Sequence, residues 1–245
     1  MGILDKAKPV KDIAQSALWV IYGRSASGKT TLASTFPKPL LCIAIGDDGQ
    51  ESIRDIDGVN VLQVNDVAQL TQALQELETD RKYATVLIDT FSLVVNEWIE
   101  AEVASKKKKM TQQAWGELKT DTETIIRRLK KLANSRNIIL TCHEVTDTVE
   151  GLEDELLPDV RPNIGKGSRT YLEGMANYGI HTTVLKKEKE MPDGTTKTVI
   201  KFAVHLNNHP YYWVKTQKSQ SVKLPTYLID PSYDKIVSLI KGDKI

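Results

Sequence analysis

The sequence lacks a long apolar run, an apolar N-terminal stretch and all but two cysteines. No run of 18 apolar residues occurs among its 245 residues, so no membrane-spanning helix is predicted. Residues 1–6 lack the apolar core of a secretory signal, and Lys6 replaces the Ser or Thr of a myristoylation signal. Cys42 and Cys142 each lie in an apolar run, so we expect reduced core thiols without a disulfide. These absences favour a cytoplasmic protein that has no membrane partner.

The chain also lacks an excess of charge of either sign. Its 33 Lys and Arg residues nearly balance its 32 Asp and Glu residues, which leaves a net charge of +1. A protein that binds nucleic acid through an overall positive charge is therefore not indicated, and an anionic partner must be held by a local patch. Apolar residues make up 40% of the chain, which is enough for a packed core and argues against disorder.

Short apolar runs alternate with segments of helical periodicity. Buried strands are predicted at residues 18–22, 40–45, 59–64, 85–89 and 138–142. Helices are predicted from about residue 29, over residues 67–78 with Asp66 as the cap, and over residues 111–134. This alternation predicts an α/β fold in which helices cover both faces of a mostly parallel sheet.

The pattern changes in the second half of the chain. Residues 144–170 combine charge, Pro and Gly, which predicts a long loop that is either functional or mobile. From residue 178 onward, β-prone segments flank a turn signal at residues 191–194 and predict an antiparallel hairpin. A strand at residues 211–215 and a helix that starts at Asp230 and ends near residue 241 follow. We therefore expect a flexible lead-in (1–16) and a single domain (17–245), with a small β addition (178–230).

A glycine-rich segment carries the clearest functional signal. Residues 23–30 read Gly-Arg-Ser-Ala-Ser-Gly-Lys-Thr and match the phosphate-binding pattern G-x-x-x-x-G-K-[ST] at every fixed position. The alternative, a glycine turn with an incidental lysine, does not explain the apolar run before it and the helical segment after it. Lys29 should reach the β- and γ-phosphates of ATP, and the Thr30 hydroxyl should bind Mg²⁺. The predicted ATP-binding residues are Gly23, Arg24, Ser25, Ala26, Ser27, Gly28, Lys29, Thr30 and Thr31.

Polar residues at the ends of other predicted strands complete a hydrolytic site. Asp89 ends the strand at 85–89 and suits the acid that holds the Mg²⁺ shell, although an ordinary helix cap is the alternative. Asp47 and Asp48 follow the strand at 40–45 and are candidates for activating water, or residues of a solvated turn. His143 follows the strand at 138–142, where a polar side chain can sense the γ-phosphate, or be satisfied by backbone groups.

With these residues the chain resembles the RecA-like P-loop ATPases over about residues 17–230. It is most similar to small phage-encoded RecA-like ATPases linked to single-strand annealing and recombination, among them AAA-family nucleotide-binding proteins. Besides the residues above, the resemblance rests on Trp115, on residues 138–143 (Ile-Ile-Leu-Thr-Cys-His) and on residues 161–167 (Arg-Pro-Asn-Ile-Gly-Lys-Gly). It implies a RecA-like fold, ATP and Mg²⁺ as ligands, and the host cytoplasm as the location if a phage encodes the chain.

The resemblance also implies roles for single residues. The family carries a catalytic glutamate after its second strand, and Asp48 matches that place best, with Asp47 as the alternative. Related hexameric ATPases reach a neighbour's nucleotide with a Lys-x-Arg pair, implying a homo-oligomeric ring or filament. Here Lys215 matches the lysine, but Gln217 replaces the arginine, and Lys218 is a substitute. The predicted catalytic residues are Lys29, Asp48, Asp89, His143 and Lys215.

In RecA-like proteins two loops at the same sheet edge touch single-stranded DNA. The corresponding positions here are basic, although a solvated surface is the alternative for the lysine run. The acidic stretch at residues 150–155 argues against the whole second loop lying on DNA, and Tyr171 is the one aromatic residue nearby. The predicted DNA-contacting residues are Lys106, Lys107, Lys108, Lys109, Lys166 and Arg169.

These observations favour an ATP-hydrolysing homo-oligomer that binds single-stranded DNA in recombination or annealing, with a single-strand DNA-binding protein as a further partner. A nucleotide-switched assembly or loading protein that acts on a protein partner is the main alternative. A small-molecule kinase is less favoured, because only Arg161 and Arg169 stand where such kinases carry an arginine-rich lid.

Overall fold

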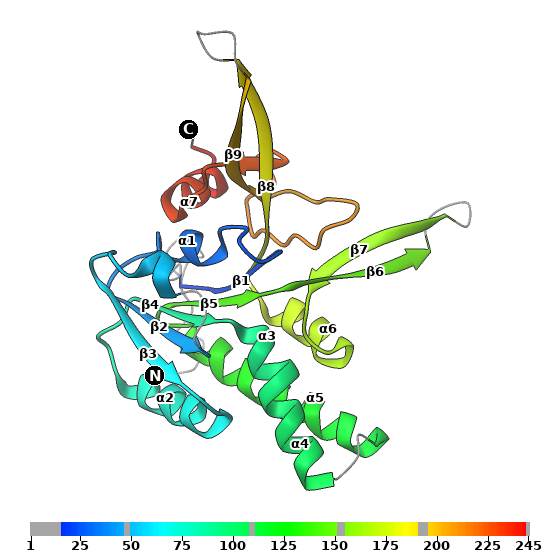
Figure 1. The fold of residues 1–245 in the computed structure, drawn as a ribbon. Helices are drawn as coiled ribbons and strands as arrows, with labels where there is room; N and C mark the ends of the chain where they lie inside the picture. The colour runs from blue at the N-terminus through cyan, green and yellow to red at the C-terminus, as the bar shows by residue number, and fades with distance from the viewer. Residues whose placement is uncertain (1–15, 47–49, 108–110, 151–154, 191–195, 244–245) are drawn as a thin grey trace, which may run out of the picture.

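A computed structural model describes residues 16–46, 50–107, 111–150, 155–190 and 196–243 of the chain (Figure 1). Several sequence-based predictions lie outside these residues. They concern Asp47, Asp48, Lys108, Lys109, most of the lead-in and the turn at residues 191–194. Among the described residues, no helix combines the length and the apolar character that crossing a membrane requires.

An eight-stranded sheet forms the centre of the molecule, with the strand order β10-β9-β8-β1-β5-β4-β2-β3. The six strands from β8 to β3 are parallel, and β9 and β10 extend the sheet in antiparallel pairing. The predicted α/β fold, in which a mostly parallel sheet carries a C-terminal antiparallel addition, is therefore confirmed. The strands are β1 (Leu18–Tyr22), β2 (Leu40–Ile45), β3 (Val59–Val64), β4 (Thr85–Asp89), β5 (Asn137–Cys142), β8 (Tyr178–Glu190), β9 (Thr196–His205) and β10 (Tyr227–Ile229).

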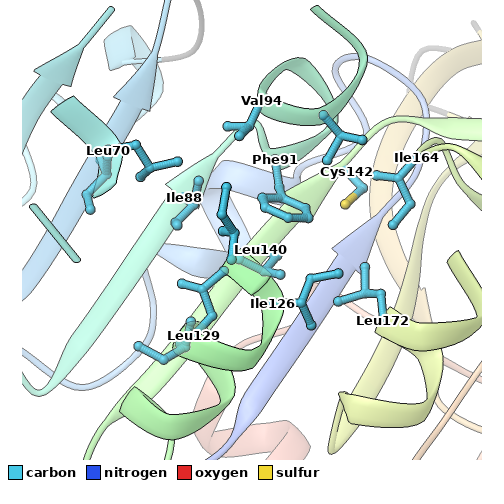
Figure 2. Packing of buried hydrophobic residues seen from close by; sticks show 14 of the residues in the cluster. Leu70, Ile88, Phe91, Val94, Ile126, Leu129, Leu140, Cys142, Ile164 and Leu172 are labelled. Atoms are coloured by element: carbon cyan, nitrogen blue, oxygen red, sulfur yellow. The ribbon is translucent and has the colours of Figure 1, made fainter. Parts of the chain in front are cut away.

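Helices cover both faces of the sheet, which is why β1, β2, β4 and β5 are buried along their whole length. Figure 2 shows Ile126 and Leu129 beside Leu140 on one face, with Leu172 next to Ile126. On the opposite face, Leu32 and Ile236 pack beneath Trp19 and Ile21 of β1. The helices are α1 (Lys29–Ala33), α2 (Val67–Thr79), α3 (Phe91–Leu93), α4 (Glu100–Lys107), α5 (Gln112–Leu132), α6 (Lys166–Met175) and α7 (Tyr233–Lys241), with a 3-10 turn at Gln50–Ile53 and a π-helical segment at Val94–Ile99.

Both cysteines are buried and free, as predicted. Cys42 lies in β2 and Cys142 ends β5. Burial raises the pKa of each thiol to about 12, so neither thiol is reactive near neutral pH.

The prediction of a long loop over residues 144–170 is wrong. β6 (Glu144–Glu150) and β7 (Leu156–Pro162) form an antiparallel hairpin, and α6 follows it. The hairpin projects from the body of the molecule (Figure 1), so most of its residues are at least partly exposed and its polar composition is compatible with strands. The two prolines of β7 are tolerated because the strand has a partner on only one side in its own two-stranded sheet.

A helical segment after β4 was not predicted from the sequence. Residues 91–107 are helical throughout, so Lys106 and Lys107 lie in α4 and not in a loop at the end of β4. Buried Val95, Ile99 and Val103 recur every four residues and are the signal of this helix.

Two smaller predictions near the C-terminus also need correction. Residues 211–215 are not a strand, because Tyr212 and Lys215 make only isolated bridges to Val160 and Gly179. The last helix is capped by the Ser232 side chain, which accepts a hydrogen bond from the Lys235 amide, and not by Asp230.

Candidate functional site

The glycine-rich segment forms a loop between β1 and α1. Gly23 and Gly28 stand at positions where a larger side chain would clash with neighbouring atoms. Gly23 adopts a φ of 158°, and a Cβ atom there would lie 2.4 Å from Thr182 Oγ1. Gly28 adopts a φ of 86°, where a Cβ would lie 3.0 Å from the Phe202 ring. The Gly23 amide donates to the Cys142 carbonyl at 3.2 Å, which ties the start of the loop to the end of β5. The loop is therefore enclosed by β5, β8 and β9.

Lys29 begins α1 and folds back across this loop. Its ammonium donates to the carbonyl oxygens of Gly23 at 3.1 Å and Arg24 at 2.7 Å. Only 7% of the residue is exposed. Burial lowers the pKa of the Lys29 ammonium, and the nearby Asp89 carboxylate offsets part of that shift. The ammonium is thus held at the loop, where a phosphate oxygen can replace the carbonyl partners.

The predicted Mg²⁺ ligands Thr30 and Asp89 are in contact. Thr30 Oγ1 donates to Asp89 Oδ2 at 2.7 Å although the two residues are 59 positions apart. Thr90 donates to Asp89 Oδ1 at 3.0 Å, and Thr141 donates to the same oxygen. Mg²⁺ prefers oxygen ligands and takes one or two carboxylates together with water. A hydroxyl and a carboxylate beside the loop therefore fit the ion.

His143 lies at the sheet edge where it was expected. Its amide donates to Ser92 Oγ at 3.0 Å, and its carbonyl accepts from the Asn163 amide at 2.7 Å. The backbone of His143 is thereby fixed between the segment after β4 and the segment after β7. A γ-phosphate-sensing role for its side chain stays a prediction.

Glu144 and His181 belong to the same site, and sequence reasoning missed both. Glu144 Oε1 accepts from Arg24 Nε and Glu144 Oε2 accepts from His181 Nε2, each at 2.9 Å. Burial lowers the pKa of His181, so the ring is neutral near pH 7 and donates its single N–H to the carboxylate. The signal for Glu144 is its place directly after His143 at a strand end. His181 carries no such signal.

A cavity of about 550 Å³ opens between the glycine-rich loop, the first residues of β6 and the middle of β8. Arg24, Ser25 and Ser27 line it from the loop, Glu144 from β6 and His181 from β8. Ser27 Oγ lies 2.6 Å from Thr182 Oγ1, which fixes one wall. The site therefore combines a phosphate loop with an adjoining polar cavity.

Lys215 does not approach the loop of its own chain. Its ammonium donates to the carbonyls of Glu173 at 2.9 Å and Gly174 at 3.0 Å in the last turn of α6. Its backbone pairs with Gly179, which lies beside Val20 in the sheet, ahead of the carboxyl end of β1. A helix-capping role is visible, and action on a neighbour's nucleotide stays a prediction. The substitute Lys218 donates to the Val222 carbonyl at 2.6 Å.

The predicted DNA-contacting residues differ in what their side chains do. Arg169 is 12% exposed and its Nη1 lies 2.6 Å from Asp147 Oδ2, so it links α6 to β6. Lys166 is 80% exposed, 4.0 Å from the other oxygen of Asp147. Lys106 pairs with Glu102 at 2.6 Å near the end of α4. At about 1.5 Å rise per residue, the helical run 91–107 carries that end roughly 25 Å from the end of β4.

Comparisons with known proteins identify the family. A family model described as an AAA domain matches residues 16–211. No curated protein matches the chain. Among solved structures, the flagellar accessory protein FlaH from Methanocaldococcus jannaschii is 11% identical, with a TM-score of 0.46 over 87% of this chain and 84% of that chain.

Proposed function

The chain belongs to the AAA domain family, and from this premise we propose that it hydrolyses ATP with Mg²⁺ and acts on single-stranded DNA as a homo-oligomer. The process would be recombination or single-strand annealing of the phage type. The contact between Thr30 and Asp89 beside the glycine-rich loop carries the ATPase part of the proposal. The motif predicts the role of Thr30, the end of a strand predicts that of Asp89, and the fold brings the two side chains into contact.

Each residue of the site has a defined task in this proposal. The loop amides and the Lys29 ammonium bind the phosphates, and the amino end of α1 adds its partial positive charge. Thr30 and Asp89 hold the ion, which neutralises charge on the β- and γ-phosphates when bound. Thr141 and Thr90 keep the Asp89 carboxylate oriented toward Thr30.

An exposed aromatic and basic surface supports the DNA part of the proposal. Trp115 is 50% exposed on α5. Lys119 follows one helical turn later, and a Cβ on Gly167 would lie 3.3 Å from its side chain, which places it beside Lys166. Aromatic rings that stack on bases and cations that contact phosphates are the two elements of single-strand recognition. Trp115, Lys119 and Lys166 are termed the α5–α6 surface below.

The hairpin β6–β7 favours a protein partner as the second candidate. Glu150 and Glu155 are exposed acidic residues that flank Val149 and Leu156 in the sequence, and these two apolar residues are 43% and 66% exposed. Such a surface repels a polyanion but suits a protein that is basic and apolar. A nucleotide-switched assembly protein would use it.

The kinase alternative gains no support from the two arginines that suggested it. Arg161 lies 2.6 Å from Asp159 and 3.4 Å from Glu173, and Arg169 is paired with Asp147. Both guanidinium groups are therefore engaged in contacts within the hairpin and α6.

ATP hydrolysis with and without single-stranded DNA tests the proposal. We expect DNA to stimulate hydrolysis and to bind more tightly with ATP present, and Trp115→Ala to weaken binding about tenfold, because one stacked base contributes roughly 1–3 kcal/mol. Tyr227→Ala is the matched control, since Tyr227 is 47% exposed on the distant strand β10.

Two outcomes would contradict parts of the proposal. If the protein hydrolyses ATP but binds DNA neither with nor without bound nucleotide, the DNA part of the proposal is overturned and the protein partner is favoured. Equal loss of binding in both variants would show that the α5–α6 surface is not where DNA binds.

A further inference from the structure

Glu144 is a carboxylate at the phosphate loop for which the family motif provides no role. It is the first residue of β6, directly after His143, and its side chain turns toward the loop and β8. One oxygen contacts Arg24 of the loop and the other contacts His181. The residue thus bridges three segments that are far apart in the sequence.

The two side-chain interactions of Glu144, with Arg24 and with His181, differ in strength. The Arg24 side chain is 86% exposed, whereas that of Glu144 is only 14% exposed. An ion pair with a solvated guanidinium is weak and is readily exchanged. His181 is 3% exposed and stacks on Tyr212 at 3.9 Å, so its hydrogen bond is held in place by packing. The carboxylate is therefore fixed on the His181 side and exchangeable on the Arg24 side.

The exchangeable side of Glu144 faces a cavity that adjoins the phosphate loop. The cavity of about 550 Å³ is shared by Glu144, Ser25 and Ser27, so it adjoins the loop that holds the phosphates. The nearby charge of Glu144 also acts to raise the pKa of the Lys29 ammonium. A phosphate bound at the loop would compete for the Arg24 guanidinium and release Oε1 of Glu144 toward the cavity.

We propose that Glu144 orients and deprotonates the water that attacks the γ-phosphate. The water oxygen bonds to the γ-phosphorus while the bond from that phosphorus to the β–γ bridging oxygen breaks. The bridging oxygen leaves with its electron pair on ADP, and the water proton passes to Glu144 and then to solvent. His181 is a positioning residue that holds the carboxylate. This inference rests on the ATPase activity proposed above.

Glu144→Gln tests the inference because glutamine keeps the size and can still accept from Arg24. A purely structural role therefore predicts activity near the wild type. The proposal predicts that kcat falls by about 100-fold or more, within the range that a general base contributes. KM, the affinity for an unhydrolysed ATP analogue and the melting temperature should stay close to those of the wild type.

Three further variants sharpen the test. Glu150→Gln, an exposed glutamate on the same strand, should leave kcat unchanged. Glu144→Asp keeps a carboxylate that is one methylene shorter, so its kcat should lie between those of the wild type and Glu144→Gln. Asp48→Asn tests the rival carboxylate and should cost less than Glu144→Gln.

Several results would overturn the inference. A Glu144→Gln protein that keeps a third or more of the wild-type kcat, or that loses ATP affinity in proportion to kcat, would assign Glu144 a structural role. Equal kcat values for the Asp and Gln variants would do the same. A wild-type protein that binds ATP without hydrolysing it would instead overturn the proposed function, and this inference with it.

Discussion

Asp89 shows how single residues build this site. Its carboxylate is 6% exposed and accepts hydrogen bonds from Thr30, Thr90 and Thr141. A buried carboxylate costs free energy unless hydrogen bonds satisfy it, and three hydroxyl groups do so here. Because hydroxyl groups are neutral, these partners add no positive charge that would compete with Mg²⁺ for the carboxylate.

Asp89→Asn should separate the charge of this residue from its structural contacts. The side-chain amide keeps the size and one accepting oxygen, so the melting temperature should change little. Loss of the charge should weaken Mg²⁺ binding and lower kcat at least tenfold, with partial recovery at high Mg²⁺ concentration. ATPase rates over a Mg²⁺ titration measure this. An unchanged Mg²⁺ dependence would show that Asp89 does not hold the ion.

At the scale of single residues, the glycine-rich motif predicted only the roles of the residues that belong to it. It indicated Lys29 and Thr30, and the position of Asp89 at a strand end predicted that its carboxylate holds the Mg²⁺ shell. The place of Glu144 after a strand end is a signal, but its contacts could not be predicted, because they depend on Arg24 and on His181, which lies 37 residues further along the chain. The engagement of Arg169 with Asp147 likewise depends on the hairpin that brings them together.

Among the elements, the buried parallel strands were predictable and the two strands of the β6–β7 hairpin were not. β1, β2, β4 and β5 are short apolar runs because both of their faces are covered. β6 and β7 face solvent on most sides, so their composition resembles that of a loop. Hydrophobic periodicity arises because one face of an element is buried. A hairpin outside the core buries few side chains, so its sequence shows little periodicity.

A pair of glycines tests how tightly the elements pack. A Cβ on Gly179 of β8 would lie 2.4 Å from Trp213, so Gly179→Ala should lower the free energy of unfolding by roughly 1–3 kcal/mol. A Cβ on Gly116 of α5 would meet no atom within 4 Å, so Gly116→Ala should raise it by about 0.5–1 kcal/mol.

Thermal or denaturant unfolding of the two glycine variants measures these changes. The melting temperatures should move in opposite directions, downward for Gly179→Ala and upward for Gly116→Ala. Equal stability of Gly179→Ala and the wild type would mean that Trp213 does not pack against β8 as described.

The charge of the whole molecule is divided between its surfaces. The hairpin β6–β7 is acidic, whereas the α5–α6 surface presents Lys119 and Lys166 beside Trp115. The net charge of +1 conceals this division. A homo-oligomer would repeat the α5–α6 surface once per subunit, so a modest charge per subunit would be multiplied along a strand of DNA.

The α5–α6 surface therefore predicts salt-dependent DNA binding. Lys166→Ala should weaken single-stranded DNA binding and reduce the slope of log affinity against log salt by about 0.7 for each phosphate that the lysine neutralises in the wild type. Basal ATP hydrolysis should not change, because Lys166 lies outside the nucleotide site. Lys82→Ala, an exposed lysine just before β4, is the control. Identical slopes for Lys166→Ala and the wild type would place the DNA-binding surface elsewhere.

The central claim is that the molecule is an ATPase whose chemistry depends on Lys29. The most direct test is the rate of Mg²⁺-dependent ATP hydrolysis by the wild type, Lys29→Ala and Lys29→Met. Because Lys29 is buried, the Met variant is needed to keep its aliphatic volume while removing the charge. We predict measurable hydrolysis by the wild type and less than about 1% of it in both variants, with the Met variant folded. Near-normal turnover in either variant would contradict the account.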